Sequence, residues 1–373
     1  MKKIILILGL IVGIYACSSG NDNNDTDTGG GNNFDRTAML TNWADNIIIP
    51  SYTNYQTKVA TLQTAATAFN TTPTDANLKI VRAAWLDAYK AYQYTAIYNF
   101  GKALDINFNA MSNTYPADAA GINANITGTY NLDLLSQYSR QGFPGLDYLL
   151  NGLAADDAGI LVFYTTNANA AKYKKYLSDV ITKLKQNSDT VLASWKSGYR
   201  ESYIKNSSTA VGSSIAETTN NFVKNFEKDV RSGKLGIPAG KFSNGTTFPE
   251  KVEAYYKNDV SRDLLNIGVK ASQDFFNGKY FASETTGPSL KAYLDYVNAT
   301  RDGKKLSDII NTQFATIFTT NQTLSNSLSQ QVVNDNTKML TAYDALQKNV
   351  IYTKLDMMQA LNITIDYVDG DGD

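Results

Sequence analysis

The sequence predicts an all-α protein in which two helical bundles pack together, after a signal segment and a flexible tether. Apolar residues recur at steps of three and four over most of the chain beyond residue 50, which is the period of an amphipathic helix. Only seven prolines occur in 373 residues, which favours long uninterrupted helices. Segments that alternate polar and apolar residues are scarce, so helix-on-helix packing is the expected architecture.

Residues 1–16 are predicted to be a lipoprotein signal peptide. Lys2 and Lys3 precede an apolar run, residues 4–15, that is shorter than the roughly twenty residues of a membrane-spanning helix. Cys17, the only cysteine, follows the small Ala16 and resembles a bacterial lipoprotein cleavage site. We therefore expect the Cys17 thiol to carry lipid and to hold the chain on a membrane as an outer-membrane lipoprotein of the cell envelope. The alternative is an ordinary secretory signal.

Residues 17–33 are predicted to be a disordered tether. They are rich in Asn, Asp, Gly, Ser and Thr and lack apolar side chains to bury. Their acidic character resembles the tethers of surface-displayed lipoproteins, and a spacer that faces the periplasm is the alternative. Since no second cysteine exists, no disulfide can form within the chain, and the fold depends on its apolar core.

Residues 34–180 are predicted to form the first bundle. One apolar stripe covers residues 52–69 and a second covers residues 78–92. Between them, Thr72-Pro73 indicates a helix cap followed by proline at the first helical position. Residues 101–129 are rich in Asn, Ala and Gly and are predicted to be a long irregular loop, a kind of segment that is more often functional or mobile than inert.

Residues 181–373 are predicted to form the second bundle. A long helix over residues 173–195 crosses this boundary, so it could bridge the two halves. Apolar stripes of helical period predict the later helices at residues 215–230, 290–297, 306–317 and 339–346.

The composition excludes several classes of function. The 34 basic residues balance 35 acidic residues and form no basic patch, so no nucleic-acid partner is expected. The chain contains no histidine, which excludes a histidine-bearing zinc helix, a Ser-His-Asp triad and a Cys-His pair. The 24 tyrosines can bind ferric iron, stack on a flat ligand or fill a core, and core filling is the expectation for most of them.

Several segments, in their order along the chain, resemble the imelysin family of all-helical exported bacterial proteins. The resemblance extends from about Phe34 to Asp373 and implies a fold of two packed helical bundles. The matching segments are Trp85, Tyr89 and Gln93; Gly101-Lys102; residues 115–118; residues 142–150; residues 234–238; residues 253–256; residues 274–278; and residues 365–373.

The chain departs from the family at its signature, which is glycine, any residue, histidine, two residues and glutamate. Gly142 is kept, while Pro144 stands at the histidine position and Asp147 at the glutamate position. Proline suits the first position of a helix, and an acidic residue in the first turn complements the helix dipole. The role of the imidazole is lost. Asp147 either retains an altered binding role, as a possible metal ligand, or belongs to a purely structural helix start.

The resemblance implies a ligand site near Gly142, Pro144 and Asp147, between the bundles. Its other candidate residues are Trp85, Tyr89 and Glu253. Oxygen donors of this kind favour hard cations such as ferric iron, whereas haem would need Tyr or Met as its axial ligand.

The implied function is a lipid-anchored, non-enzymatic binding protein of an iron- or haem-uptake system, working beside a transport partner. A peptidase-like enzyme is the first alternative, since the family was once classed among the peptidases. The second alternative is a helical surface scaffold that binds a protein or glycan.

Overall fold

Helices make up most of the part of the chain that the structure describes. The computed structural model describes residues 33–367, so the predicted signal peptide, Cys17 and all but the last residue of the predicted tether lie outside the described residues. The two short strands β1 (Thr300–Arg301) and β2 (Lys304–Lys305) pair in antiparallel fashion. The predicted all-α fold class is confirmed.

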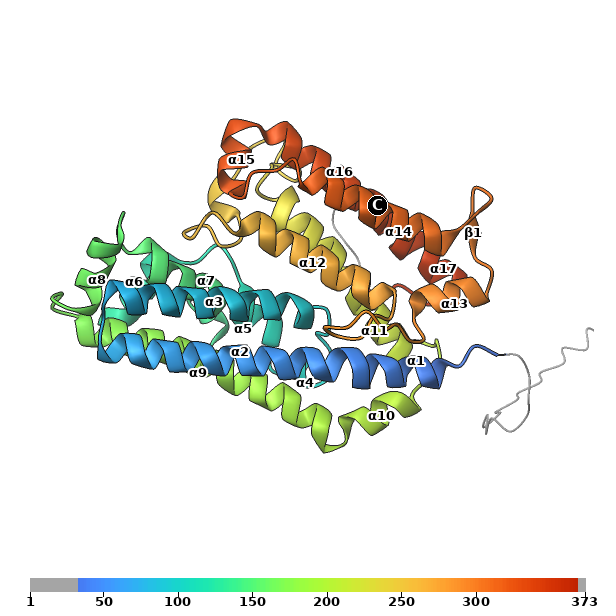
Figure 1. Cartoon of the computed structure of the whole chain (residues 1–373), viewed down its shortest axis with the longest axis horizontal. Helices are drawn as coiled ribbons and strands as arrows, with labels where there is room; N and C mark the ends of the chain where they lie inside the picture. The colour runs from blue at the N-terminus through green and yellow to red at the C-terminus, as the bar shows by residue number, and fades with distance from the viewer. Residues whose placement is uncertain (1–32, 368–373) are drawn as a thin grey trace, which may run out of the picture. The chain divides into compact units, whose positions relative to one another are not determined.

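The first group of helices is built around three long, lengthwise-packed helices, α2, α3 and α9 (Figure 1). Their inward faces carry the predicted stripes, since Tyr52, Val59 and Leu62 on α2 are fully buried. The helical segments up to residue 205 are α1 (Arg36–Asn42), π-helical η1 (Trp43–Ile48), α2 (Ile49–Thr71), α3 (Asp75–Thr95), α4 (Lys102–Asp105), α5 (Phe108–Asn113), α6 (Ala119–Thr127), 3-10 helical η2 (Leu135–Arg140), α7 (Gly142–Asp147), π-helical η3 (Tyr148–Gly152), α8 (Asp157–Tyr164), α9 (Ala170–Ser194), π-helical η4 (Trp195–Tyr199) and α10 (Arg200–Lys205).

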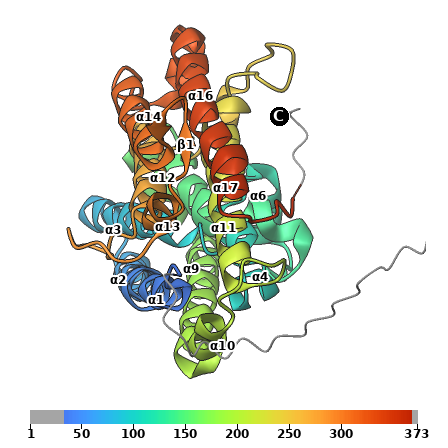
Figure 2. The ribbon, with the colours of Figure 1, turned by 90° about the vertical axis from the view of Figure 1, so that its right-hand side faces the viewer.

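The second group is built around η5, α12, α14 and α16, with α12 packed against α3 of the first group. Figures 1 and 2 both show α14 and α16 on the side of α12 away from α2 and α3. Its helical segments are α11 (Ser214–Lys224), π-helical η5 (Asn225–Gly236), 3-10 helical η6 (Pro249–Lys251), α12 (Ser261–Phe276), α13 (Leu290–Tyr296), α14 (Leu306–Asn321), α15 (Leu328–Asn334), α16 (Asn336–Val350), π-helical η7 (Ile351–Met357) and α17 (Met358–Ala360).

The predicted boundary between two bundles falls inside the continuous helix α9, which runs through residues 180 and 181. The residues from Phe34 onward form one compact unit. The division into bundles at residues 34–180 and 181–373, and a helix that bridges them, therefore stay predictions, and α9 packs against helices of the first group.

Two local predictions were wrong. Residues 101–129 are not one irregular loop, because they contain α4, α5 and α6, and the Asp118 side chain caps α6 by accepting from the Gly121 N–H at 2.8 Å. Helix α3 is capped by Thr74 rather than Thr72, since the Thr74 hydroxyl accepts from the Asn77 N–H at 3.3 Å.

No helix of residues 33–367 is both long and apolar enough to cross a bilayer.

Candidate functional site

The signature segment is a buried helix start that packs against two of the predicted site residues. Gly142 begins α7 with φ +66°, and a Cβ there would lie 2.3 Å from the Ser112 carbonyl oxygen. The Phe143 ring stacks on Tyr89, with ring centroids 4.4 Å apart. The Trp85 indole N–H donates to the Phe143 carbonyl at 3.1 Å. The structure therefore brings Trp85 and Tyr89 together with the signature, as predicted.

Pro144 and Asp147 differ from the predicted geometry of a helix start. Pro144 is the third residue of α7 rather than the first, and Asp147 lies beyond the first turn, where the helix continues into η3. The charge of Asp147 is thus not placed against the first turn. Both side chains are buried, and Asp147 is directed toward a segment far along the chain.

The Asp147 carboxylate holds the loop that follows Glu253. It accepts from the backbone N–H groups of Tyr256 at 2.8 Å and Lys257 at 2.9 Å, and from the Asn151 side chain at 3.1 Å. Burial raises the pKa of Asp147 to about 7, against the lowering effect of these three hydrogen bonds. These contacts favour the structural alternative for Asp147, and a ligand role for it stays a prediction.

Glu253, the remaining predicted residue, is the centre of a buried polar network. Its carboxylate forms an ion pair with Lys234 and accepts from Asn113 at 2.8 Å and Gln93 at 3.2 Å. The Tyr89 hydroxyl donates to the same Asn113 at 2.5 Å. Because a buried carboxylate without partners is strongly destabilising, this network fixes Glu253 in place. It also links the signature segment to the second group of helices.

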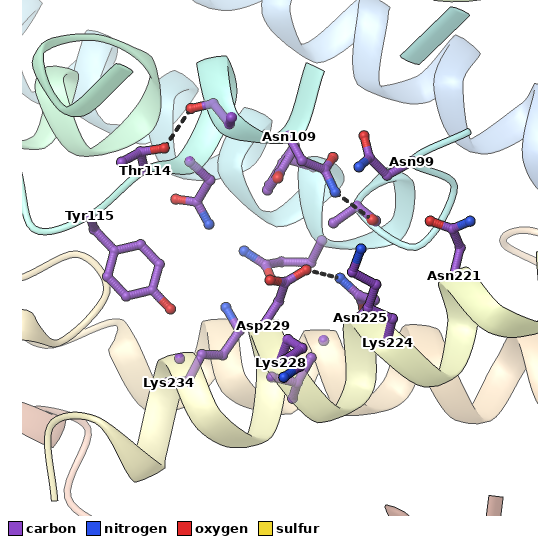
Figure 3. A pocket seen from close by; sticks show the side chains of 18 of the residues that line it. Asn99, Asn109, Thr114, Tyr115, Asn221, Lys224, Asn225, Lys228, Asp229 and Lys234 are labelled. Atoms are coloured by element: carbon purple, nitrogen blue, oxygen red, sulfur yellow. Dashed lines mark hydrogen bonds between the residues drawn. The ribbon is translucent and has the colours of Figure 1, made fainter. Parts of the chain in front are cut away.

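A cavity of about 430 Å³ lies beside this network. Gln93 and Asn113, which bind Glu253, and Lys234, its ion-pair partner, all line the cavity. Figure 3 shows one wall formed by Asn99, Asn109, Thr114 and Tyr115, and a facing wall formed by α11 and η5. The labelled residues on the α11–η5 wall are Asn221, Lys224, Asn225, Lys228, Asp229 and Lys234. This volume falls within the usual range for small-molecule sites.

The cavity is polar and carries more cations than anions. Lys224, Lys228 and Asp229 are its charged residues besides Lys234, whose charge is balanced by Glu253. Asp229 accepts from the Asn225 side chain at 2.9 Å, and burial raises the pKa of its carboxyl. Burial also raises the pKa of the Tyr115 phenol well above its ordinary value, so Tyr115 keeps its proton and can donate a hydrogen bond.

The described residues do not fit a bare metal ion. Within residues 33–367, no group of three or more His, Cys, Asp or Glu side chains comes close enough to hold a metal. Asp147 and Glu253 have their oxygens engaged by other groups.

Sequence reasoning missed the charged residues of the α11–η5 wall, namely Lys224, Lys228 and Asp229. The sequence shows these charged residues on a predicted helix, but it does not distinguish them from ordinary surface residues, because polar residues in a helical pattern usually face solvent. The segment 101–129 was singled out as functional or mobile because it was predicted to be a long irregular loop, which it is not. It supplies Asn109, Asn113, Thr114 and Tyr115 to the cavity.

Comparisons with known proteins agree with the fold. The family model described as imelysin matches residues 48–351. A relative named iron-regulated protein A, from Synechococcus elongatus, is 25% identical over 242 residues. That match covers 61% of this chain and 62% of the relative, which is less than two thirds of the relative's length.

Two solved structures are similar to the chain. A protein from Parabacteroides distasonis, described as a candidate iron-regulated protein A precursor, is 17% identical with a TM-score of 0.70, over 87% of this chain and 94% of that one. An imelysin-like protein from Psychrobacter arcticum is also 17% identical, with a TM-score of 0.59, over 89% of this chain and 97% of that one. At this identity the two structures support the fold alone.

Proposed function

The chain belongs to the imelysin family, and we propose that it is a lipid-anchored, non-enzymatic binding protein of an iron- or haem-uptake system. The name of the Synechococcus relative, iron-regulated protein A, supports the iron-related part of this proposal. The signal segment and Cys17 support the anchor, which would place the protein in the cell envelope as an outer-membrane lipoprotein.

The observation that carries the proposal is the polar cavity between the segment 92–115 and the segment 221–237. Its buried walls include Gln93, Asn225 and Lys234, which are held in place by hydrogen bonds or an ion pair. A preformed cavity with fixed polar groups suits selective binding of a small molecule.

Two features of the side chains support a binding role without catalysis. The chain has no histidine to serve as a general base. Asp147 accepts hydrogen bonds from a backbone loop and does not line the cavity. Tyr92 and Tyr115 are the phenols that line the cavity and could serve as an axial ligand if haem is the cargo. A ferric complex needs no such ligand, because a chelator supplies the donors to the metal.

The test is growth under iron limitation of the source bacterium after deletion of the gene. We expect slower growth and slower uptake of radioactive iron than in the parent, with normal growth when iron is plentiful. Complementation by the wild-type gene should restore both, whereas Ala110→Leu, which places a larger side chain in the cavity, should restore neither. Ala124→Leu, an exposed change on α6 in the same stretch of chain, is the matched control. Equal growth of parent and deletion strain at low iron would refute the proposal.

A further inference from the structure

The two lysines that line the cavity outside the Glu253 network form no salt bridge among residues 33–367. Lys224 and Lys228 are four residues apart on one side of the α11–η5 segment, and both line the cavity. Among residues 33–367, neither forms a salt bridge, whereas the third lysine of the cavity, Lys234, is paired with Glu253. Asp229 is the single carboxylate among the lining side chains, so the lining carries an excess of one positive charge. Outside the lining, the Lys224 ammonium also lies 6.0 Å from the centroid of the Tyr367 ring and acts electrostatically on Asp366. A cavity of this charge attracts an anion.

Asp229 does not turn the cavity into a cation site. Its carboxylate already accepts from Asn225, and Lys224 and Lys234 both act on it electrostatically. A cationic ligand would have to approach Asp229 past the ammonium groups of the same wall. A carboxylate ligand would instead form charge-assisted hydrogen bonds with those ammonium groups.

The facing wall offers neutral hydrogen-bonding groups. The side-chain oxygens of Asn99 and Asn109 are buried and accept no hydrogen bond within the described residues. Because neither oxygen is open to the cavity in this structure, each amide has to turn toward a ligand before it can accept from a hydroxyl group. The Tyr115 hydroxyl lies against Gly233, where an added Cβ would come within 2.8 Å of it. Glycine at this position thus lets the phenol reach the α11–η5 wall.

We propose that the cavity binds a small hydroxycarboxylate, whose carboxylates pair with Lys224 and Lys228 and whose hydroxyl is bound by the asparagine wall. This inference rests on the proposed function, from which it follows that the ligand arrives as a chelate of ferric iron. The cavity volume of about 430 Å³ suits such a small chelate. The chelator supplies the metal donors that the described residues do not provide as a cluster.

The experiment is isothermal calorimetry on the purified chain without its signal segment, since the residues from Phe34 onward form one compact unit. The probes are citrate, ferric citrate and gallium citrate, a redox-inert mimic of the iron complex. Tricarballylate lacks the hydroxyl of citrate, and spermidine is a cationic probe. The variants are Lys224→Gln, Lys228→Gln, the double variant and Ala110→Leu. Lys196→Gln, an exposed lysine of η4, is the matched control.

We expect ferric and gallium citrate to bind alike, and tricarballylate to bind less well than citrate. The double lysine variant should bind at least about tenfold more weakly, consistent with the loss of charge-assisted hydrogen bonds. Lys196→Gln should match the wild type. Binding that is unchanged in the double variant and in Ala110→Leu would overturn the inference, as would preference for spermidine.

An absence of binding by every citrate probe would also overturn the inference, but it would leave the proposed function standing, because that depends on growth at low iron. Conversely, tight citrate binding together with a deletion strain that grows normally at low iron would keep the ligand class and remove the uptake role.

Discussion

Asp147 connects two segments that are more than a hundred residues apart. Its carboxylate, at the end of α7, accepts the backbone N–H groups of Tyr256 and Lys257. In that loop, Ala254 and Asn258 have positive φ angles of 56° and 71°, and the Asn258 N–H donates to the Ala254 carbonyl at 2.8 Å. The neighbouring Glu253 forms the buried network beside the cavity. Asp147 thus holds the loop next to Glu253, whose partners line the cavity, and does not line the cavity itself.

Replacement of Asp147 by alanine should destabilise the chain by about 2–4 kcal/mol, because two backbone N–H groups lose their acceptor. Urea denaturation followed by circular dichroism measures this difference in free energy of unfolding. Asp259→Ala, an exposed carboxylate beside the same loop, is the control and should change stability by less than about 0.5 kcal/mol. Equal stability of the two variants would show that the Asp147 contacts are not important for the fold.

The same carboxyl group predicts a pH dependence of stability. Burial raises its folded-state pKa to about 7, above the ordinary value of 3.8, so the folded chain binds its proton more tightly than the unfolded chain does. The stabilisation that this raised pKa gives the folded chain is therefore fully present below pH 3.8 and is lost as the pH rises through 7. Asp147→Asn does not titrate, so the stability of the wild type relative to this variant should fall by roughly 1–4 kcal/mol between pH 4 and pH 8. A constant difference between the two proteins across this range would contradict the raised pKa.

At the scale of elements, the π-helical segment η5 presents different side chains on two faces. Lys228, Asp229 and Lys234 line the cavity, while Glu227 and Arg231 are fully buried on the other face. Helix α11 passes into this segment without a break, since Asn225 keeps helical φ and ψ angles. π-Helical turns are frequent at functional sites because they change which residues share a face.

The long helices were predictable from the sequence, whereas the site was predictable only in part. The stripe from Tyr52 to Phe69 marks the buried face of α2, because the side chains that recur every three or four residues lie on one face of a helix, and that face packs into the core. No comparable pattern marks the π-helical geometry of η5 or the pairing of Asp147 with a loop 109 residues later. Such contacts depend on tertiary packing. The family resemblance was what placed Trp85, Tyr89 and Glu253 near one another.

The turn into α7 gives a prediction about backbone conformation. Gly142→Ala adds a Cβ at φ +66° that would lie 2.3 Å from the Ser112 carbonyl oxygen. Gly212→Ala is the matched control, since Gly212 has φ +81° with no atom within 4 Å of the added Cβ. The control should lose about 1 kcal/mol from the positive φ alone, and Gly142→Ala should lose at least about 2 kcal/mol more. Thermal and urea denaturation measure both, and equal losses would mean that the backbone at Ser112 moves aside freely.

At the scale of the whole molecule, the two groups of helices share an aromatic contact surface. The Phe275 ring on α12 lies 5.0 Å from Trp43 and 5.8 Å from Tyr98, measured between ring centroids. Gln93 and Asn113 add hydrogen bonds to Glu253 across the same surface. Because these contacts are buried, separation of the groups would expose both apolar and charged side chains. We therefore expect the groups to unfold together, although the sequence predicts two bundles.

The three tryptophans make this expectation measurable, because Trp43, Trp85 and Trp195 all belong to the first group of helices. Tryptophan fluorescence reports on that group, whereas far-ultraviolet circular dichroism reports on every helix. Leu346→Ala removes a fully buried side chain from α16 in the second group and should cost about 2–5 kcal/mol. If the unit is cooperative, this change shifts the fluorescence transition in urea by the same amount as the circular dichroism transition. A fluorescence midpoint that stays at the wild-type value would instead establish two domains that unfold independently.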